Sequence, residues 1–377
     1  MKRFLIILSL VLIIAAVGVV GWGYRELRTL VHHGRSGQYI EIPKGTTPAA
    51  VIKKLKAAGI IKHEHPTLMY LKLTGAGQRF KAGDYDFPSP ITPYAVLAKL
   101  QTGERRLIRM TVVEGWTRWD IANAMARIPE LKLTDSNSAL ELMDDITLIQ
   151  DHDPRAKNLE GYLFPDTYEF PPDTRPAELI AIMVKRFRAV WKPDWTAKAL
   201  SLGLSPQQIV TIASLVETEA KLDIERPIIA SVIYNRLKLN MPLGIDSTVI
   251  YASKLEGKWR NNGKVYQSDI DRRSPYNTRL NAGLPPGPIA SSGEQALTAA
   301  VNPSQTDYLY YVREPSRNDG AHNFYNNEND FFTGVQSLRR WEEQRDLENS
   351  RKKAEGEMIR PQMNTDTLGS AAPERKQ

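Results

Sequence analysis

The sequence predicts an α+β protein in which one apolar N-terminal helix precedes a small α+β module and a larger mixed α/β domain. Three observations support this class. Residues 4–24 carry no charge over a length that can cross a bilayer as a helix. Beyond them, segments that alternate as strands do are followed by segments of helical periodicity that begin at capping residues. The chain has 377 residues, enough for two domains with cores of their own.

The N-terminal segment is expected to be a transmembrane anchor over residues 1–24, followed by a juxtamembrane linker over residues 25–37. Lys2 and Arg3 precede the apolar run, so the N-terminus is expected in the cytoplasm. The chain would then be a single-pass protein of the inner (cytoplasmic) membrane, with its bulk on the periplasmic, extracytoplasmic side. The alternative is a cleaved signal peptide, whose apolar core is usually shorter, about 7–15 residues. A retained anchor is therefore favoured.

The small module is expected over residues 38–107. Residues 39–42 and 83–87 read as strands. Each is followed by a helix that opens with a Thr-Pro pair, at Thr47 and at Thr92, where the threonine can cap the helix and proline suits its first turn. The module therefore repeats a strand and a capped helix.

The larger domain is expected over residues 108–345, and residues 346–377 are expected to be a disordered tail because they hold few large apolar side chains. Thr117 with Asp120 has the spacing of a capping box, and Ser291 is expected to cap another helix. Further predictions are helices at 176–191, 205–220, 225–239 and 331–346, a helix start at Asp246, a Gly- and Pro-rich loop at 272–288 and a strand at 307–312.

The composition excludes several classes of function. The absence of cysteine excludes disulfides, thiolate metal sites and a cysteine nucleophile. The formal net charge is +7, but no basic cluster is interleaved with aromatic residues, so no nucleic-acid partner is expected. His63 and His65 flank Glu64 without further ligands at metal-site spacing, so neither a metal nor another cofactor is expected.

The helix predicted at 205–220 carries two carboxylates near its end. Ser205 and Gln208 can form a capping box at its start. Glu217 and Glu219 stand two positions apart, which turns them about 200° from each other around the helix. They cannot act as a pair, but one can be desolvated in a cleft while the other is solvated or ion-paired. Helix geometry alone does not choose between them.

A series of motifs runs through the larger domain: LEGYLFPDTYEF at 159–170, ASLVETEA at 213–220, IIASVIYNRL at 228–237, DSTVIYA at 246–252, SPYNTR at 274–279 and GLPPGPIASSG at 283–293. In this order they resemble the YceG-like family of endolytic murein transglycosylases, over residues 39–341. The resemblance implies cleavage of the β-1,4 bond between N-acetylmuramic acid and N-acetylglucosamine in nascent peptidoglycan, with formation of a 1,6-anhydro end that terminates the strand. It also implies a LysM-like fold for the module at 38–107 and glycan polymerases of the penicillin-binding type as partners.

The resemblance implies that Glu219, the second carboxylate of the pair, is the catalytic acid and base. Other polar residues of the motifs could bind the glycan, and each has an alternative role in buried hydrogen bonds, caps or loops. These candidate substrate-binding residues are Glu160, Tyr162, Glu217, Asn235, Asp246, Ser247, Tyr276, Asn277 and Thr278.

Two other functions remain open at the level of sequence. A hydrolase would use Glu219 as the acid and a second carboxylate, Asp246 or Glu160, to activate water. A scaffold without catalytic activity would only bind glycan. The module at 38–107 could likewise grip glycan chains, or it could serve only as a spacer between the membrane and the larger domain.

Overall fold

The computed structural model describes residues 2–103, 106–317 and 319–358. The chain divides into two compact units, which are considered separately. Unit 1 comprises Met1–Met110 and Tyr168–Thr174, and unit 2 comprises Thr111–Thr167 and Arg175–Gln377. The described residues form helices and three two-stranded sheets, which confirms the mixed helix-and-sheet class.

Unit 1 begins with helix α1, Lys2–Arg28, which continues past the expected end of the anchor at residue 24. Its last turns are anchored in the unit, because Gly23 and Leu27 are buried and α1 packs against α3, Glu64–Thr74, and α4, Pro93–Thr102. The linker predicted at 25–37 is thus partly helical and docked. Leu27 supplies the apolar contact that holds it there.

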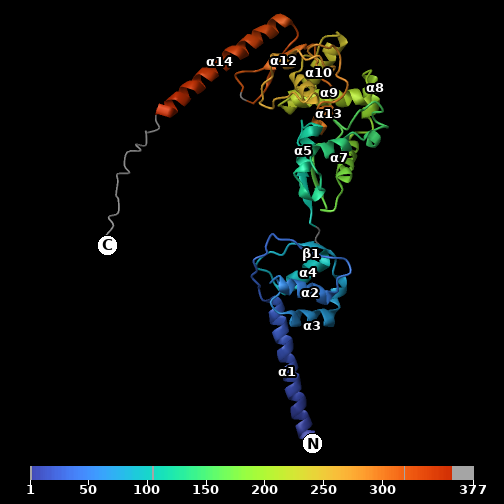
Figure 1. Cartoon of the computed structure of the whole chain (residues 1–377), viewed down its shortest axis with the longest axis vertical. Helices are drawn as coiled ribbons and strands as arrows, with labels where there is room; N and C mark the ends of the chain where they lie inside the picture. Colours follow the sequence, from blue (N-terminus) through green and yellow to red (C-terminus); the bar gives the residue numbers. More distant parts are fainter. Residues whose placement is uncertain (1, 104–105, 318, 359–377) are drawn as a thin grey trace, which may run out of the picture. The chain divides into compact units, whose positions relative to one another are not determined.

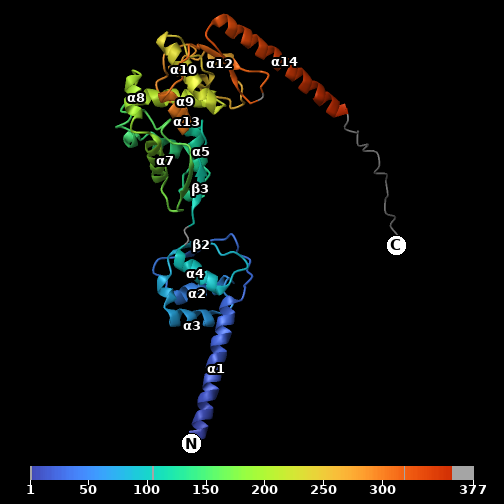
Figure 2. The same ribbon diagram turned by 180° about the vertical axis from the view of Figure 1, so that it is seen from behind.

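The core of unit 1 lies between a two-stranded ribbon and its helices (Figure 1 and Figure 2). Strand β1, Ile40–Ile42, pairs antiparallel with β2, Gly83–Tyr85. Helix α2, Pro48–Ala57, and α4 bury their apolar faces in the same cluster. Both helices are capped as predicted, since Thr47 and Thr92 accept hydrogen bonds from the third residue of the following turn. Helix α3 was not predicted.

Strand β3, Ile108–Thr111, pairs with β4, Thr167–Phe170, which comes from the aromatic motif at 159–170. Arg109 and Glu169 form an ion pair across this ribbon, at 2.5 Å. Residues 168–174 were expected in the larger domain, whereas they group with unit 1 in the structure. Strand β4 pairs with β3, most of which also belongs to unit 1.

Unit 2 is organised around helix α9, Pro206–Glu219 (Figure 1). Every residue from Ile209 to Glu217 is buried. The capping box of Ser205 and Gln208 is present as predicted. The helices that pack on α9 are α8, Trp195–Ser201, α10, Arg226–Lys238, α11, Asp246–Leu255, and α13, Glu294–Val301.

The remaining elements of unit 2 extend from this centre. The capping box at Thr117 and Asp120 is confirmed at the start of α5. The other helices of unit 2 are α5, Arg118–Ala126, α6, Ser136–Met143, α7, Pro176–Val190, and α12, Gln267–Ile270. Strands β5, Tyr310–Arg313, and β6, His322–Tyr325, form an antiparallel pair. Short 3-10 turns occur at Pro129–Leu131, Ile146–Leu148 and Asp223–Glu225, with another in unit 1 at Ala76–Arg79.

Two predicted boundaries were wrong. Helix α13 begins at Glu294 with Gly293 as its N-cap, instead of Ser291. The Glu217 carboxylate accepts the Gly293 N–H at 2.9 Å, the bond to the N-cap that the N3 side chain makes in a capping box.

The last helix, α14, covers Glu328–Met358, so part of the predicted disordered tail is helical. Phe331 of α14 stacks on Tyr310 of β5, and the rest of the helix is rich in Glu, Gln, Arg and Lys, which are strong helix formers. The rest of the predicted tail, 359–377, lies outside the described residues.

Candidate active site

Glu219 lies at the last position of α9, where three elements converge on its carboxylate. The Tyr311 hydroxyl, from β5, donates a hydrogen bond to Glu219 Oε2 at 2.9 Å. Ser247, from the first turn of α11, places its hydroxyl 3.5 Å from Oε1. The same hydroxyl lies 2.8 Å from that of Thr218. Glu219 therefore has one firm partner and a second, looser one.

The environment of Glu219 favours its protonated form. Burial raises the pKa of the Glu219 carboxyl, the hydrogen bond from Tyr311 lowers it, and the negative charge of Asp246 raises it again. The net pKa is above the ordinary value. Because Glu219 is only partly buried by surface area, it keeps access to solvent. This combination suits a carboxyl that must hold a proton and deliver it.

Tyr311 is itself held in place by residues behind it. The ring of His322, on β6, stands edge-on to the Tyr311 ring, with the ring centres 5.4 Å apart. His322 Nδ1 lies 2.8 Å from Glu225 Oε2, and the His322 backbone N–H donates to Glu225 Oε1 at 2.9 Å. The β5–β6 pair is thus tied to the turn before α10. The position of this strand pair sets the distance between the Tyr311 hydroxyl and the Glu219 carboxylate.

Glu217 points to the opposite side of α9, as the helix geometry predicted. Its carboxylate forms a 3.0 Å ion pair with Arg226, and both side chains are almost fully buried. Its other oxygen accepts the Gly293 N–H. Glu217 therefore links α9 to α10 and α13. The structure gives it a role in joining helices, away from the Glu219 carboxylate.

Asp246 and Ser247 open α11 beside Glu219, so the structure brings this predicted motif to the site. The Asp246 carboxylate is paired with Arg279 at 2.6 Å. Asn235 lies on α10, and its amide donates to the carbonyls of Thr306 and Tyr308, both at 2.9 Å. Asn235 thus holds the segment that leads into β5, and these bonds occupy both of its N–H groups.

Three other predicted glycan ligands, Tyr162, Asn277 and Thr278, are buried, and their role in binding glycan stays a prediction. The Asn277 amide donates to the carbonyls of Ile270 and Arg272. The Thr278 hydroxyl accepts the Ile245 N–H at 3.1 Å. The Tyr162 hydroxyl donates to Asp153 at 2.9 Å. These hydrogen bonds engage their polar groups within the fold.

Glu160 and Tyr276 form a second polar group in unit 2. Glu160 is buried and accepts hydrogen bonds from the Arg118 N–H at 3.1 Å and the Tyr251 hydroxyl at 3.2 Å. Burial raises the pKa of its carboxyl to about 7. The Tyr276 ring packs on Tyr251, with the ring centres 4.9 Å apart. None of these hydrogen bonds reaches Glu219.

A comparison with family models gives a match to the YceG-like family over residues 40–337. This stretch is most of the chain. The chain belongs to the YceG-like family.

Named relatives agree with this assignment. The chain is 35% identical to an endolytic murein transglycosylase of Bacillus subtilis over 78% of its own length and 84% of the relative's. It is 29% identical to an endolytic murein transglycosylase of Streptococcus pneumoniae over 88% of its own length, but spans only 64% of that relative. A crystal structure of a YceG-like protein from Listeria monocytogenes matches 78% of this chain and 98% of that one, with 30% identity and a TM-score of 0.54.

In this YceG-like chain the sequence analysis did not identify Tyr311, His322 or Glu225 as site residues. Tyr311 lies in a segment predicted only as a strand, and it is 92 positions from Glu219. Strand alternation shows which residues share a face, but it does not show which distant element that face meets. The only available signal was the aromatic density of 308–311 and of the segment at 320–325.

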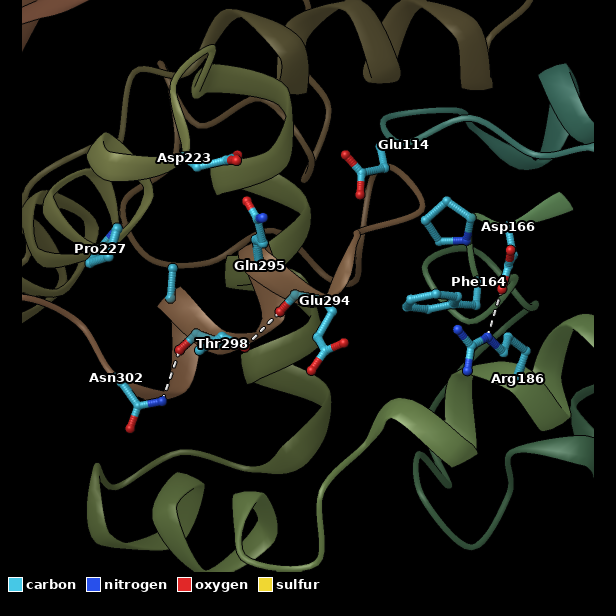
Figure 3. Close-up of a pocket in the computed structure, with 12 residues that line it drawn as sticks. Glu114, Phe164, Asp166, Arg186, Asp223, Pro227, Glu294, Gln295, Thr298 and Asn302 are labelled. Atoms are coloured by element: carbon cyan, nitrogen blue, oxygen red, sulfur yellow. Dashed lines mark hydrogen bonds and ion pairs between the residues drawn. The ribbon is translucent and has the colours of Figure 1, made fainter.

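A cavity of about 870 Å³ lies in unit 2 of this YceG-like chain (Figure 3). Glu114 and Glu294 line it, and Figure 3 shows Phe164 and Arg186 on another wall. Glu219 is not among its lining residues. Burial, and then the charge of Glu217, raise the pKa of Glu114. Within the described part of the chain, no group of three or more His, Asp or Glu side chains is placed to hold a metal.

Proposed function

We propose that the chain is an endolytic murein transglycosylase, which cuts glycan strands of peptidoglycan internally. Family membership and the names of the relatives support this proposal. The observation that carries it is the Glu219 carboxyl, part-buried, raised in pKa and hydrogen-bonded by Tyr311.

In the proposed reaction, protonated Glu219 gives its proton to the oxygen that joins N-acetylmuramic acid to N-acetylglucosamine. The bond between this oxygen and the anomeric carbon breaks. The Glu219 carboxylate then takes the proton of the muramyl 6-hydroxyl as that oxygen attacks the anomeric carbon. The products are a 1,6-anhydro end and a free 4-hydroxyl, and Glu219 is protonated again. Burial stabilises its acid form and the Tyr311 hydrogen bond its carboxylate, so both roles are served.

The alternative of a hydrolase requires a second carboxylate that activates water on the other face of the sugar. The carboxylates considered for this task are already bound. Asp246 is paired with Arg279, Glu160 accepts from Arg118 and Tyr251, and Glu217 is paired with Arg226. An intramolecular attack needs no such partner, because the 6-hydroxyl is tethered to the reacting sugar.

The proposal places the chain at the inner membrane. One described helix is long and apolar enough to cross a bilayer, at Ile6–Arg28, although a signal sequence would have the same features. A retained anchor with a cytoplasmic N-terminus would hold unit 2 on the periplasmic side, near newly made strands. Cleavage there terminates strand elongation, and glycan polymerases of the penicillin-binding type are the expected partners. Fractionation tests the anchor, since a mature protein that is soluble and begins near residue 24 would contradict it.

Unit 1 is proposed to be a LysM-like module that binds glycan, with a spacer as the alternative role. Its paired strands and capped helices support the comparison. In full-length protein, replacing exposed residues of this unit should raise KM more than it lowers kcat if the unit holds substrate. Unchanged kinetics would leave the spacer role.

The reaction class is tested by mass spectrometry of fragments released from purified sacculi by the full-length protein. A transglycosylase gives strand ends one water lighter than a hydrolase does, and these ends resist reduction by borohydride. Glu219→Gln protein is the control for contaminating activity. Reducible ends, or ends labelled by heavy-oxygen water, would show a hydrolase. No release of fragments by the wild type would support the glycan-binding scaffold.

A further inference from the structure

A narrow cavity of about 110 Å³ lies in unit 2 at the other end of α9 from Glu219. Glu160, Gln207 and Tyr276 contribute its polar lining. Three prolines line it as well, at Pro275, Pro286 and Pro288. The first two of these prolines are exposed, so the cavity has a way to solvent. It is therefore a small pocket with both polar and apolar walls.

The polar groups of this pocket are not all satisfied by the fold. Glu160 is buried and lines the pocket; its carboxyl accepts from the Arg118 N–H and the Tyr251 hydroxyl, and its two oxygens have further acceptor sites. Among the described residues the Tyr276 hydroxyl has no hydrogen-bond partner, although the residue is mostly buried. A methyl group added to Gly287 would lie 3.3 Å from this hydroxyl and 4.0 Å from Gln207 Nε2. The lack of a side chain at Gly287 thus keeps the space beside both groups open.

These walls match the chemistry of one group found on every sugar of murein. An acetamido group has an N–H that donates, a carbonyl that accepts and a methyl that is apolar. The Glu160 carboxyl can accept the N–H, and the free Tyr276 hydroxyl can donate to the carbonyl. The proline rings offer an apolar surface for the methyl. Leaving either polar group of the pocket unpaired on burial of a ligand would cost affinity, which makes the match selective.

We propose that this pocket is a subsite for the acetamido group of an N-acetylated amino sugar, remote from the scissile bond. The inference rests on the proposed function, which supplies the substrate class. Gln207 and Glu219 are separated by about 18 Å along α9, given a rise of about 1.5 Å per residue. The pocket would therefore hold a strand several sugars away from the cut.

Two cationic side chains at the pocket offer a way to determine which of the two murein sugars it binds. Arg155 and Lys157 line it, are exposed, and form no ion pair among the described residues. N-acetylmuramic acid carries a peptide stem with carboxylates, whereas N-acetylglucosamine carries none. If the pocket holds the muramyl residue, these cations should contribute to binding of strands that bear stems. That contribution should weaken with salt.

The experiment measures binding to full-length protein carrying Glu219→Gln, so that ligands are not cleaved. The ligands are N-acetylglucosamine oligomers and the same oligomers after removal of the acetyl groups, at low and high salt. Gly287→Ala narrows the pocket, and Tyr276→Phe removes only the hydroxyl. We expect Tyr276→Phe to lower the affinity for acetylated oligomers by about 2- to 12-fold, the equivalent of one hydrogen bond. Gly287→Ala should lower it at least as much.

The decisive quantity is the ratio of affinities for acetylated and deacetylated oligomers. Both variants should reduce this ratio, and Tyr266→Phe, which removes a hydroxyl of unit 2 outside the pocket, should not. An unchanged ratio in Gly287→Ala and Tyr276→Phe would overturn the proposal.

Stem-bearing murein strands form a second arm of the experiment. The double variant Arg155→Gln, Lys157→Gln should weaken their binding and leave oligomer binding unchanged if the muramyl sugar occupies the pocket. Equal effects on both ligands would assign the pocket to N-acetylglucosamine. The failure of the proposed function is distinguishable, because it appears as absent cleavage by the wild-type protein, whatever the variants do to binding.

Discussion

Replacing Tyr311 by phenylalanine should move the pH dependence of the reaction. The change removes the hydroxyl that donates to Glu219 at 2.9 Å and keeps the ring that packs against His322 and Phe324. This hydrogen bond lowers the pKa of Glu219, whereas burial raises it. Without the bond, the pKa of Glu219 rises further.

The size of the shift follows from the strength of the bond. A hydrogen bond to a charged group contributes about 1.5–3 kcal/mol, and about 1.4 kcal/mol corresponds to one pKa unit. The expected increase is therefore about 1–2 units. Glu219 must be protonated to act as the acid, so activity falls as the pH rises through its pKa. The alkaline limb of kcat/KM should accordingly move about 1–2 units to higher pH in Tyr311→Phe.

The assay is release of soluble fragments from sacculi by full-length protein across the pH range. Tyr308→Phe is the matched control, because it removes a hydroxyl from the same segment without a contact to Glu219. Its limb should coincide with that of the wild type. An alkaline limb that stays in place in Tyr311→Phe, or moves to lower pH, would refute the assignment of Glu219 as the acid and Tyr311 as its partner.

Other predictions concern the two carboxylates of α9, the buried Glu160 and the membrane helix. Glu219→Gln should keep the fold and lower the rate by about 10²–10⁴. Glu217→Gln should lose less activity but up to about 3–5 kcal/mol of stability, because it breaks a buried ion pair with Arg226. Turnover and urea unfolding measure the two effects, and the reverse pattern would make Glu217 the catalytic acid and Glu219 the structural carboxylate. The pKa of Glu160 is raised from its ordinary 4.5 to about 7, so the stability due to its neutral form is complete below about pH 4.5 and is lost as the pH rises through 7. As the pH rises from 5 to 8, the free energy of unfolding of Glu160→Gln should therefore increase by up to about 3 kcal/mol relative to that of the wild type, as measured by denaturant unfolding. An equal pH dependence in both proteins would contradict the raised pKa of Glu160. The intact protein should stay with membranes through salt and alkali washes, and its release by alkali would argue against an anchor at Ile6–Arg28.

The sequence by itself determined the local features of this protein. The capping boxes at Thr117 and Ser205 were readable because each involves residues within one turn. The divergence of Glu217 and Glu219 followed from the pitch of the helix, and the motifs indicated the family. The charge-rich start of the predicted tail was misread, since it continues α14, which packs on β5 and β6, and its Glu, Arg and Lys residues are strong helix formers.

Tertiary structure alone decided which carboxylate has which environment. Glu217 meets Arg226 from α10, and Glu219 meets Tyr311 from β5. Neither contact can be predicted from the sequence pattern of a single element. The same holds for Asn235, Asn277 and Thr278, whose side chains form hydrogen bonds with distant or neighbouring backbone. Burial and hydrogen-bond partners come from residues far apart in the chain, and these determine pKa and access. Sequence patterns reach only a few residues, so they named the candidates but could not assign their partners.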